Sequence, residues 1–203
     1  FNKGLTLTAL GSFWWGVIGV VYFKYISFAG PIEVVIHRCI WTSAVLIITT
    51  FYFSKWNIFF EIISNRKKLV WLFFSGLLIF VNWATWIYAV GTEKIIDASF
   101  GYFIMPILSV FLGYIFYNEK INRKRSISII LVLISILFLM AVNYNSIPWV
   151  GIIVALSWGF YNLLRKKVNV DTDVGLLIES LFILRFALFS FYIIFQNNFN
   201  DFS

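Results

Sequence analysis

Seven long apolar runs follow one another along this 203-residue chain, and they constrain its fold more than any other feature. An α-helix needs about 18 or more mostly apolar residues to cross the hydrocarbon core of a bilayer. Apolar residues make up 61% of the chain and charged residues only 12%, which is too little polar surface for a water-soluble domain of this size. We therefore expect an all-α polytopic membrane protein with spans near residues 5–23, 32–53, 69–88, 98–117, 126–143, 148–164 and 176–195.

The basic residues gather on one side of the expected membrane. If the N-terminus is cytoplasmic, twelve of the 16 Lys and Arg residues fall in the N-terminal segment and in the connections after the second, fourth and sixth spans. Only Lys24 and Lys94 fall in connections on the other side. Short cytoplasmic loops collect Lys and Arg, so this sorting predicts a cytoplasmic N-terminus and contacts with anionic lipid, and it argues against nucleic-acid binding.

The longest connection, residues 54–68, alternates aromatic and basic residues. Such a pattern predicts a short helix that lies on the cytoplasmic leaflet. The other connections are shorter, so consecutive spans should be antiparallel neighbours.

Two pairs of expected spans share a pattern. The first span contains ALGSFWWGVIGVVYFKY and the sixth contains VALSWGFYNLLRKKV, each with a serine followed by Trp, Gly, aromatic and then basic residues. The second and seventh begin GPIEVVIHR and GLLIESLFILR, each with Glu followed five or six residues later by Arg. Because an offset of five spans is odd, matching spans run in opposite directions, which predicts an inverted-topology repeat of the transporter kind. We expect a first five-helix repeat over residues 1–144 and the start of a second over residues 145–203, whose remaining helices lie outside this chain.

Four segments resemble one family: PIEVVIHRCIW, VNWATWIYAV, IDASFGYFIMPILSVFLGYIFYNEKI and IPWVGIIVALSWGFYNLLRKKVNVDT are similar to the RarD-type permeases, in the EamA branch of the drug/metabolite transporter superfamily. The resemblance covers essentially the whole chain. It implies ten helices in two inverted repeats in the cytoplasmic membrane of a bacterium. It also implies export or exchange of small metabolites or drugs without ATP hydrolysis, with amino acids and aromatic drugs such as chloramphenicol as candidate substrates.

Three ionisable residues enter the second span. Glu33 and His37 are four residues apart and share a helix face, whereas Arg38 lies about 100° round the helix from His37. They could pair with one another or reach the interface, and Glu33 would be favoured by the dipole of a helix that starts at Pro31. Alternatively, Glu33 or His37 couples transport to protons, or Arg38 contacts a substrate carboxylate or hydroxyl.

Other polar and aromatic residues within the spans are further candidates for a solute site. Asn82 needs a hydrogen-bond partner in hydrocarbon, from a neighbouring helix or from a cavity that it lines with Trp86. Pro106 can kink its helix and so act as a gate or as a static bend. The remaining candidates are Tyr102 and Glu179, which is the repeat partner of Glu33. Three aromatic residues are candidates by their repeat position, although Trp and Tyr near span ends are more often interfacial anchors: Trp15, Trp158 and Tyr161.

Taken together, these features favour a secondary transporter that works by alternating access. A non-transporting membrane assembly subunit is the first alternative, and a membrane-embedded enzyme is the second. The sequence has no Gly-rich phosphate loop, no Asp-rich pair for magnesium and no His pair for zinc, so we expect neither an enzyme nor a cofactor or metal. The substrate, the coupling ion and the formation of a homodimer stay open.

Overall fold

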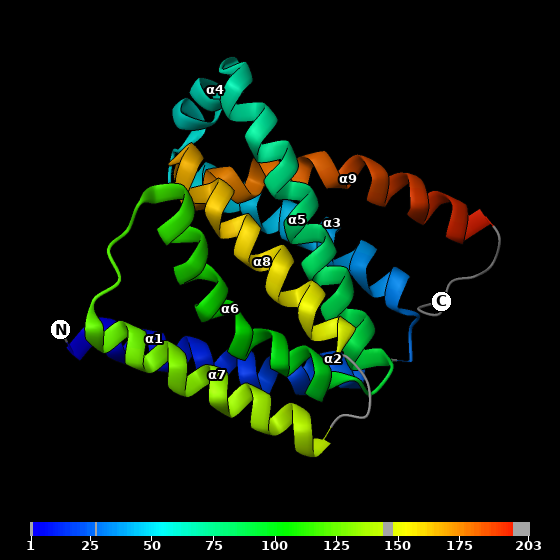
Figure 1. The fold of residues 1–203 in the computed structure, drawn as a ribbon. Coiled ribbons are helices and arrows are strands. Elements are labelled where there is room, and N and C mark those ends of the chain that lie inside the picture. The colour runs from blue at the N-terminus through cyan, green and yellow to red at the C-terminus, as the bar shows by residue number, and fades with distance from the viewer. Residues whose placement is uncertain (1, 27, 144–147, 197–203) are drawn as a thin grey trace.

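The computed structural model describes residues 2–26, 28–143 and 148–196, and these residues form helices with no strand among them (Figure 1). The first helix is continuous and has a π-helical middle segment. Helix bounds are α1 Asn2–Phe13, η1 Trp14–Gly19, α2 Val20–Tyr25, α3 Pro31–Tyr52, α4 Trp56–Ser64, α5 Arg66–Gly91, α6 Ile95–Tyr117, α7 Arg123–Asn143, α8 Trp149–Val168 and α9 Thr172–Gln196.

Every span predicted from the sequence coincides with a helix. Within the described residues, four helical stretches are long and apolar enough to cross a membrane: 3–25, 31–52, 66–91 and 95–117. Helices α7, α8 and α9 have 21, 20 and 25 residues, and their crossing stays a prediction. The short helix expected in the longest connection is α4. The fold class, an all-α polytopic membrane protein, is confirmed.

Local sequence signals explain where several helices begin and end. Helix α3 starts with Pro31, whose missing N–H costs nothing at the first helical position. Helix α5 is capped by Asn65, whose side chain accepts a hydrogen bond from a backbone N–H of the first turn. Helices α6 and α8 end at Asn118 and Asn169, which adopt the left-handed conformation with φ of 51° and 49°.

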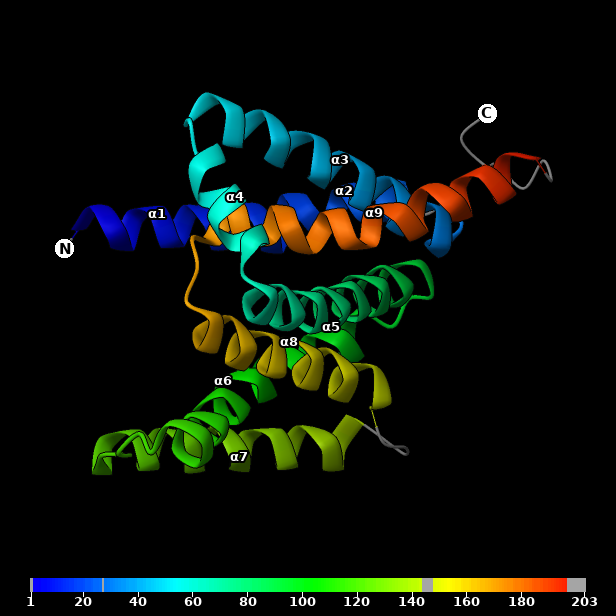
Figure 2. The same ribbon diagram turned by 90° about the horizontal axis from the view of Figure 1, so that it is seen from above.

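The long helices stack in layers. Viewed from above, α3 and α9 lie on one side of α5 and α8, and α6 and α7 lie on the other (Figure 2). The most extensive packing joins α6 and α5 to α8, and α3 to α9. The connections near residues 26–30 and 92–94 lie at the lower right of Figure 1, and those near 53–55, 118–122 and 169–171 lie at its left and top, so the chain runs back and forth. Most of the basic residues lie in this second group of connections or in the helix ends that adjoin it, and we call this end of the bundle the basic end.

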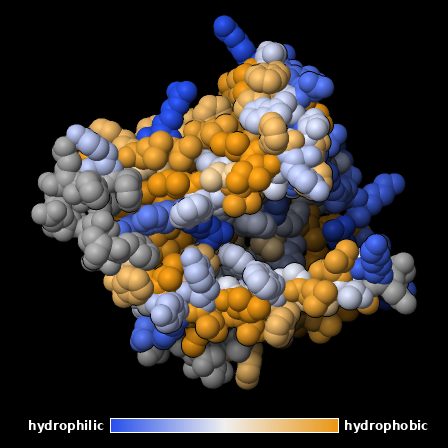
Figure 3. Space-filling model, turned by 180° about the vertical axis from the view of Figure 1, so that it is seen from behind, coloured by the Kyte–Doolittle hydropathy of each residue, from blue (hydrophilic) through white to orange (hydrophobic). Residues whose placement is uncertain are grey.

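The surface of the bundle is largely apolar. Figure 3 shows a face that is mostly orange, with blue groups toward its edges and a hollow near its middle. Large side chains are exposed along the helices, for example Trp41 at 66% and Phe51 at 75%. In water such a surface would aggregate, but in a bilayer it faces acyl chains.

Helices α6 and α8 touch at two glycines. A Cβ added to Gly101 would clash with the backbone carbonyl oxygen of Gly151, and one added to Gly151 would clash with that of Asp97. Small residues at a contact allow backbones to approach in lipid, where apolar burial between helices gives little driving force. This contact fixes α6 against α8 and therefore sets the shape of the space between them.

We predict that Gly151→Ala lowers the free energy of unfolding by about 1–3 kcal/mol, the usual cost of overpacking a tight contact. The matched control is Gly11→Ala in α1, where an added Cβ has nothing within 4 Å. Thermal midpoints of the purified protein in one detergent measure the difference. Equal midpoints for the two variants would contradict the close α6–α8 contact.

Candidate functional site: a central aromatic cavity

A cavity of about 420 Å³ lies where η1, α3, α5, α6, α8 and α9 meet, and we call it the central cavity. Its size is within the range of small-molecule sites, about 300–1,000 Å³. Aromatic residues predominate in its wall, and one residue of the wall is charged. The lining residues are Trp15, Arg38, Ile79, Asn82, Trp83, Trp86, Tyr102, Met105, Trp158, Tyr161 and Leu176.

The aromatic rings of the wall contact one another. The ring centroids of Trp15 and Trp86 are 6.2 Å apart, and the ring of Tyr102 stands nearly perpendicular to that of Trp86 at 5.5 Å. On α8, Trp158 and Tyr161 are also 5.5 Å apart. Trp15 belongs to the π-helical segment η1, and π-helical turns occur frequently at functional sites. The rings therefore form a packed wall with contributions from four helices.

Arg38 is held by aromatic faces rather than by a carboxylate. Its guanidinium carbon lies 4.5 Å from the ring centroid of Trp83. The rings of Trp15 and Phe23 are 5.4 and 5.5 Å from the same carbon. Among the described residues, no ion pair includes Arg38, and one of its terminal nitrogens is buried without a hydrogen-bond partner. Cation–π contacts stabilise the charge but leave donors of the guanidinium unused.

Asn82 both joins two helices and lines the cavity. Its amide nitrogen donates to the carbonyl oxygen of Val154 and to the hydroxyl of Ser157, each at 3.1 Å. Asn82 therefore has both of the roles expected from the sequence: it hydrogen-bonds a neighbouring helix, and it lines a cavity with Trp86. Its carbonyl oxygen accepts no hydrogen bond from the described part of the chain, and the indole N–H of Trp86 is buried without an acceptor there. The central cavity thus offers an acceptor as well as donors.

Glu179 lies behind the cavity wall and is fully buried. Its carboxylate accepts hydrogen bonds from the hydroxyls of Ser75 at 2.5 Å and Tyr161 at 3.2 Å. A terminal nitrogen of Arg165 lies 3.5 Å from the same carboxylate. Because the ring of Tyr161 lines the central cavity, its hydroxyl connects the cavity to a buried carboxylate.

The other predicted residues lie away from the central cavity. The carboxylate of Glu33, which is 3% exposed, is 3.9 Å from Nε2 of His37, as the shared helix face predicts. His37 lines a separate cavity of about 450 Å³ between α2 and α3, and Arg38 borders both cavities. Helix α6 bends about halfway along in Figure 1, where its sequence has Pro106, and that side chain is exposed.

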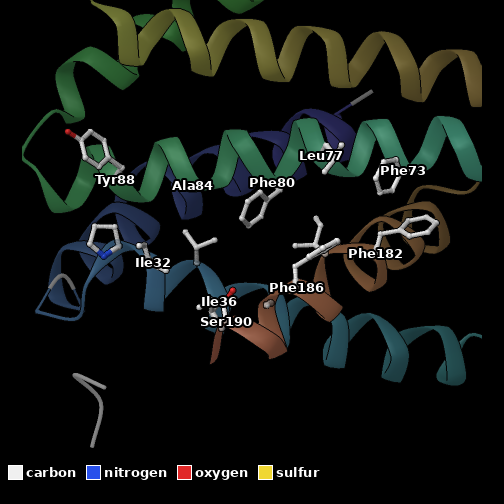
Figure 4. Close-up of a pocket in the computed structure, with 14 residues that line it drawn as sticks. Ile32, Ile36, Phe73, Leu77, Phe80, Ala84, Tyr88, Phe182, Phe186 and Ser190 are labelled. Carbon is white, nitrogen blue, oxygen red and sulfur yellow. The ribbon is translucent and has the colours of Figure 1, made fainter. Parts of the chain in front are cut away.

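A third cavity lies between α3, α5 and α9 and measures about 480 Å³ (Figure 4). Phe73, Phe182 and Phe186 line one part of it, and the polar lining residues are Tyr88 and Ser190. We call it the apolar groove. None of its described lining residues is charged, so the central cavity is the better candidate for a functional site.

Ion pairs close the basic end of the bundle. The ammonium of Lys55, just before α4, lies 3.0 Å from the carboxylate of Asp171 and 2.9 Å from that of Asp173. Hydrogen bonds to Asp173 and Asp171 raise the pKa of Lys55 above its ordinary value. Partial burial opposes ionisation of Asp171, but the Lys55 ammonium and backbone N–H groups hold the pKa of that carboxyl below its ordinary value. Glu119, which follows α6, pairs with Lys166 near the end of α8.

The candidates predicted from the sequence do not include Trp83 or two partners of Glu179, Ser75 and Arg165. Trp83 forms the shortest cation–π contact of Arg38, and the spacing of Ile79, Asn82, Trp83 and Trp86 on one face of α5 was a usable signal. Ser75 belongs to α5, which is distant in sequence from the α9 helix of Glu179, whereas Arg165 belongs to the preceding helix α8, and no sequence pattern pairs either residue with Glu179.

Residues 2–141 match the EamA-like transporter family. The chain is 32% identical over 190 residues to the "Uncharacterized transporter YojE" of Bacillus subtilis, covering 92% of this chain and 63% of that protein. It is 32% identical over 186 residues to "Protein RarD" of Escherichia coli, covering 92% and 62%. With the "Chloramphenicol-sensitive protein RarD" of Pseudomonas aeruginosa it shares 26% identity over 198 residues, covering 94% and 64%. The chain thus spans under two thirds of the length of these relatives, and no solved structure matches it.

We predict that Asp171→Asn destabilises the protein near neutral pH and that this difference disappears in acid. The folded pKa of Asp171 is below its ordinary value of 3.8, so its carboxylate contributes stability above that pH and loses the contribution as the pH falls through the folded pKa. Thermal midpoints of both proteins across a pH series measure this.

The control is Glu93→Gln at the other end of the bundle, where the carboxylate is 84% exposed, so its ion pair with Lys24 is screened by solvent. A constant difference between Asp171→Asn and the unsubstituted protein down to the lowest pH would contradict the ion-pair account.

Proposed function

Because this chain belongs to the EamA-like transporter family, we propose that it is a secondary transporter of small organic solutes and that the central cavity is its solute site. The observation that supports this best is the cavity itself. It has the volume of a small-molecule site and walls of contacting aromatic rings. Two of its lining residues, Arg38 and Trp86, each have a buried nitrogen with no hydrogen-bond partner among the described residues. Polar groups left unpaired at membrane depth are costly, and a solute that paired them would be held there.

The arrangement of the helices favours alternating access. Inverted repeats of secondary transporters rock against each other around a cavity between them, and α8 and α9 of the proposed second repeat could move in this way against α3, α5 and α6 of the first. Two residues of the first repeat, Lys55 and Glu119, pair with Asp171 and Lys166 of the second. These ion pairs would have to separate for the cavity to open at the basic end. They are therefore the contacts that we assign to the closed form of that end.

The distribution of charge supports an orientation in a bacterial inner membrane. The connections near residues 53–55, 118–122 and 169–171 share one end with the basic residues of α5, α7 and α8. Lys and Arg collect on the cytoplasmic side, so the basic end and the N-terminus would be cytoplasmic. The relatives named above come from bacteria, which agrees with that location.

Proton coupling through Glu179 belongs to the same proposal. The carboxylate is fully buried and bonded to the Tyr161 hydroxyl, whose ring lines the central cavity. A solute that displaced Tyr161 would change the hydrogen bonding of Glu179, and intramembrane carboxylates with such connections often relay protons. In this proposal, a proton on Glu179 and a solute in the cavity affect each other through Tyr161.

We predict solute flux in vesicles reconstituted with the protein, with chloramphenicol, aromatic amino acids and aromatic carboxylates as the panel. Trp158→Ala should lower the flux of a transported solute about tenfold, since a lost aromatic contact of about 1.4 kcal/mol changes a rate or an affinity by that factor. The matched control is Phe186→Ala, which removes a ring from the apolar groove and should leave flux within about twofold of the unsubstituted value.

Equal flux for both variants would contradict the proposal that the central cavity is the solute site. Flux no greater than in protein-free vesicles, for every solute and with or without a pH gradient, would favour a non-transporting assembly subunit instead. Protein content and thermal midpoints are measured in the same preparations, so that a loss of folded protein is not read as a loss of transport.

A further inference from the structure

We infer that the central cavity selects small organic anions: solutes with one carboxylate on a flat apolar body and no ammonium group. This inference rests on the proposed function, because it names the class of solute for the same cavity. The observation behind it is the charge balance of the wall. Arg38 is the charged residue that lines the cavity, and its described surroundings contain no carboxylate paired with it.

The guanidinium is placed to recognise a carboxylate. Aromatic rings lie near it on α1–α2 and α5, and one terminal nitrogen is buried without a hydrogen-bond partner in the described residues. When rings cover the faces of a planar guanidinium, its N–H donors still point outward from the edge. Two of these donors match the spacing of the two oxygens of a carboxylate. Low polarity around the cavity strengthens such a pair, because little water competes for either partner.

The nearby acidic residues are already engaged. Glu179 binds Ser75 and Tyr161 and lies beside Arg165. Glu33 lies beside His37 and does not line the central cavity. An ammonium in the cavity would therefore meet the positive charge of Arg38 with no lining carboxylate to offset it. This argument separates simple carboxylates from amino acids, which have both charges.

The rest of the wall fits a flat apolar body. The rings of Trp86 and Tyr102 meet nearly at right angles, and Trp158 extends the wall from α8. The indole N–H of Trp86 and the carbonyl oxygen of Asn82 can each hydrogen-bond a neutral substituent. The carboxylate sets the charge preference in this arrangement, and the rings set the preference for a planar body.

The test compares four solutes that share one carbon skeleton: 3-phenylpropanoate, phenylalanine, 3-phenylpropylamine and 3-phenylpropanol. Their affinities for the protein in nanodiscs are measured by isothermal titration at neutral pH. We expect 3-phenylpropanoate to bind at least about tenfold more tightly than the alcohol, because a hydrogen bond between two charged groups is stronger than one to a neutral group, and than phenylalanine, because its ammonium would meet the charge of Arg38. The amine should bind most weakly.

Two variants of Arg38 make the test specific. Arg38→Gln should remove the preference for the carboxylate over the alcohol, and Arg38→Lys, which retains the charge without the planar fork, should keep part of it. The thermal midpoint of each variant without solute reports whether it is folded. If Arg38→Gln is unfolded, the comparison rests on Arg38→Lys and on the four solutes with the unsubstituted protein.

Three results would overturn the inference: equal binding of the carboxylate and the alcohol, tighter binding of the amine or of phenylalanine, or an unchanged preference in folded Arg38→Gln. Failure of the proposed function gives a different result. If 3-phenylpropanoate binds as expected but no solute crosses reconstituted vesicles, the anion site stands and transport does not. If chloramphenicol crosses and 3-phenylpropanoate does not bind, transport stands and the anion site does not.

Discussion

A polar side chain inside a lipid-embedded bundle must find its partner within the protein, and this constraint explains most of the buried polar contacts here. Asn82 donates to α8, and Glu179 accepts from α5 and α8. Glu33 lies against His37 one turn further along its own helix. The exceptions within the described residues include Arg38 and Trp86, and both line the central cavity. Thr50 and Arg165 are further exceptions and do not line this cavity, so the central cavity accounts for part of the unused hydrogen-bonding capacity.

The same contacts join the two parts of the chain that the repeat pattern distinguishes. Asn82 to Ser157, Ser75 to Glu179 and Lys55 to Asp171 each cross from the first five long helices to α8, α9 or their connection. Helices α3 and α9, which contain the matching Glu33 and Glu179, pack against each other. An inverted repeat with its axis near this contact would explain that arrangement, and it is the basis of the rocking motion that we propose.

The long helices were predictable from the sequence because the thickness of the bilayer sets the length of the apolar runs. Helix α4 was predictable because aromatic and basic residues alternate in its segment. Seven predicted residues line the central cavity: Trp15, Arg38, Asn82, Trp86, Tyr102, Trp158 and Tyr161. The sequence could place Glu33 and His37 on one helix face, but it could not show that this face lies away from the cavity that Arg38 borders. That depends on which helices pack together, and the pairing of Ser75 with Glu179 spans 104 residues.

Photo-cross-linking with an aromatic carboxylate that contains a diazirine tests the central claim most directly, because it reports which cavity holds the solute. Peptide mapping should place the label on α5 and α6 at the face that includes Trp86, Tyr102 and Met105, and excess 3-phenylpropanoate should prevent it. Labelling confined to Phe73, Phe182 or the rest of the apolar groove would contradict the assignment of the central cavity as the solute site.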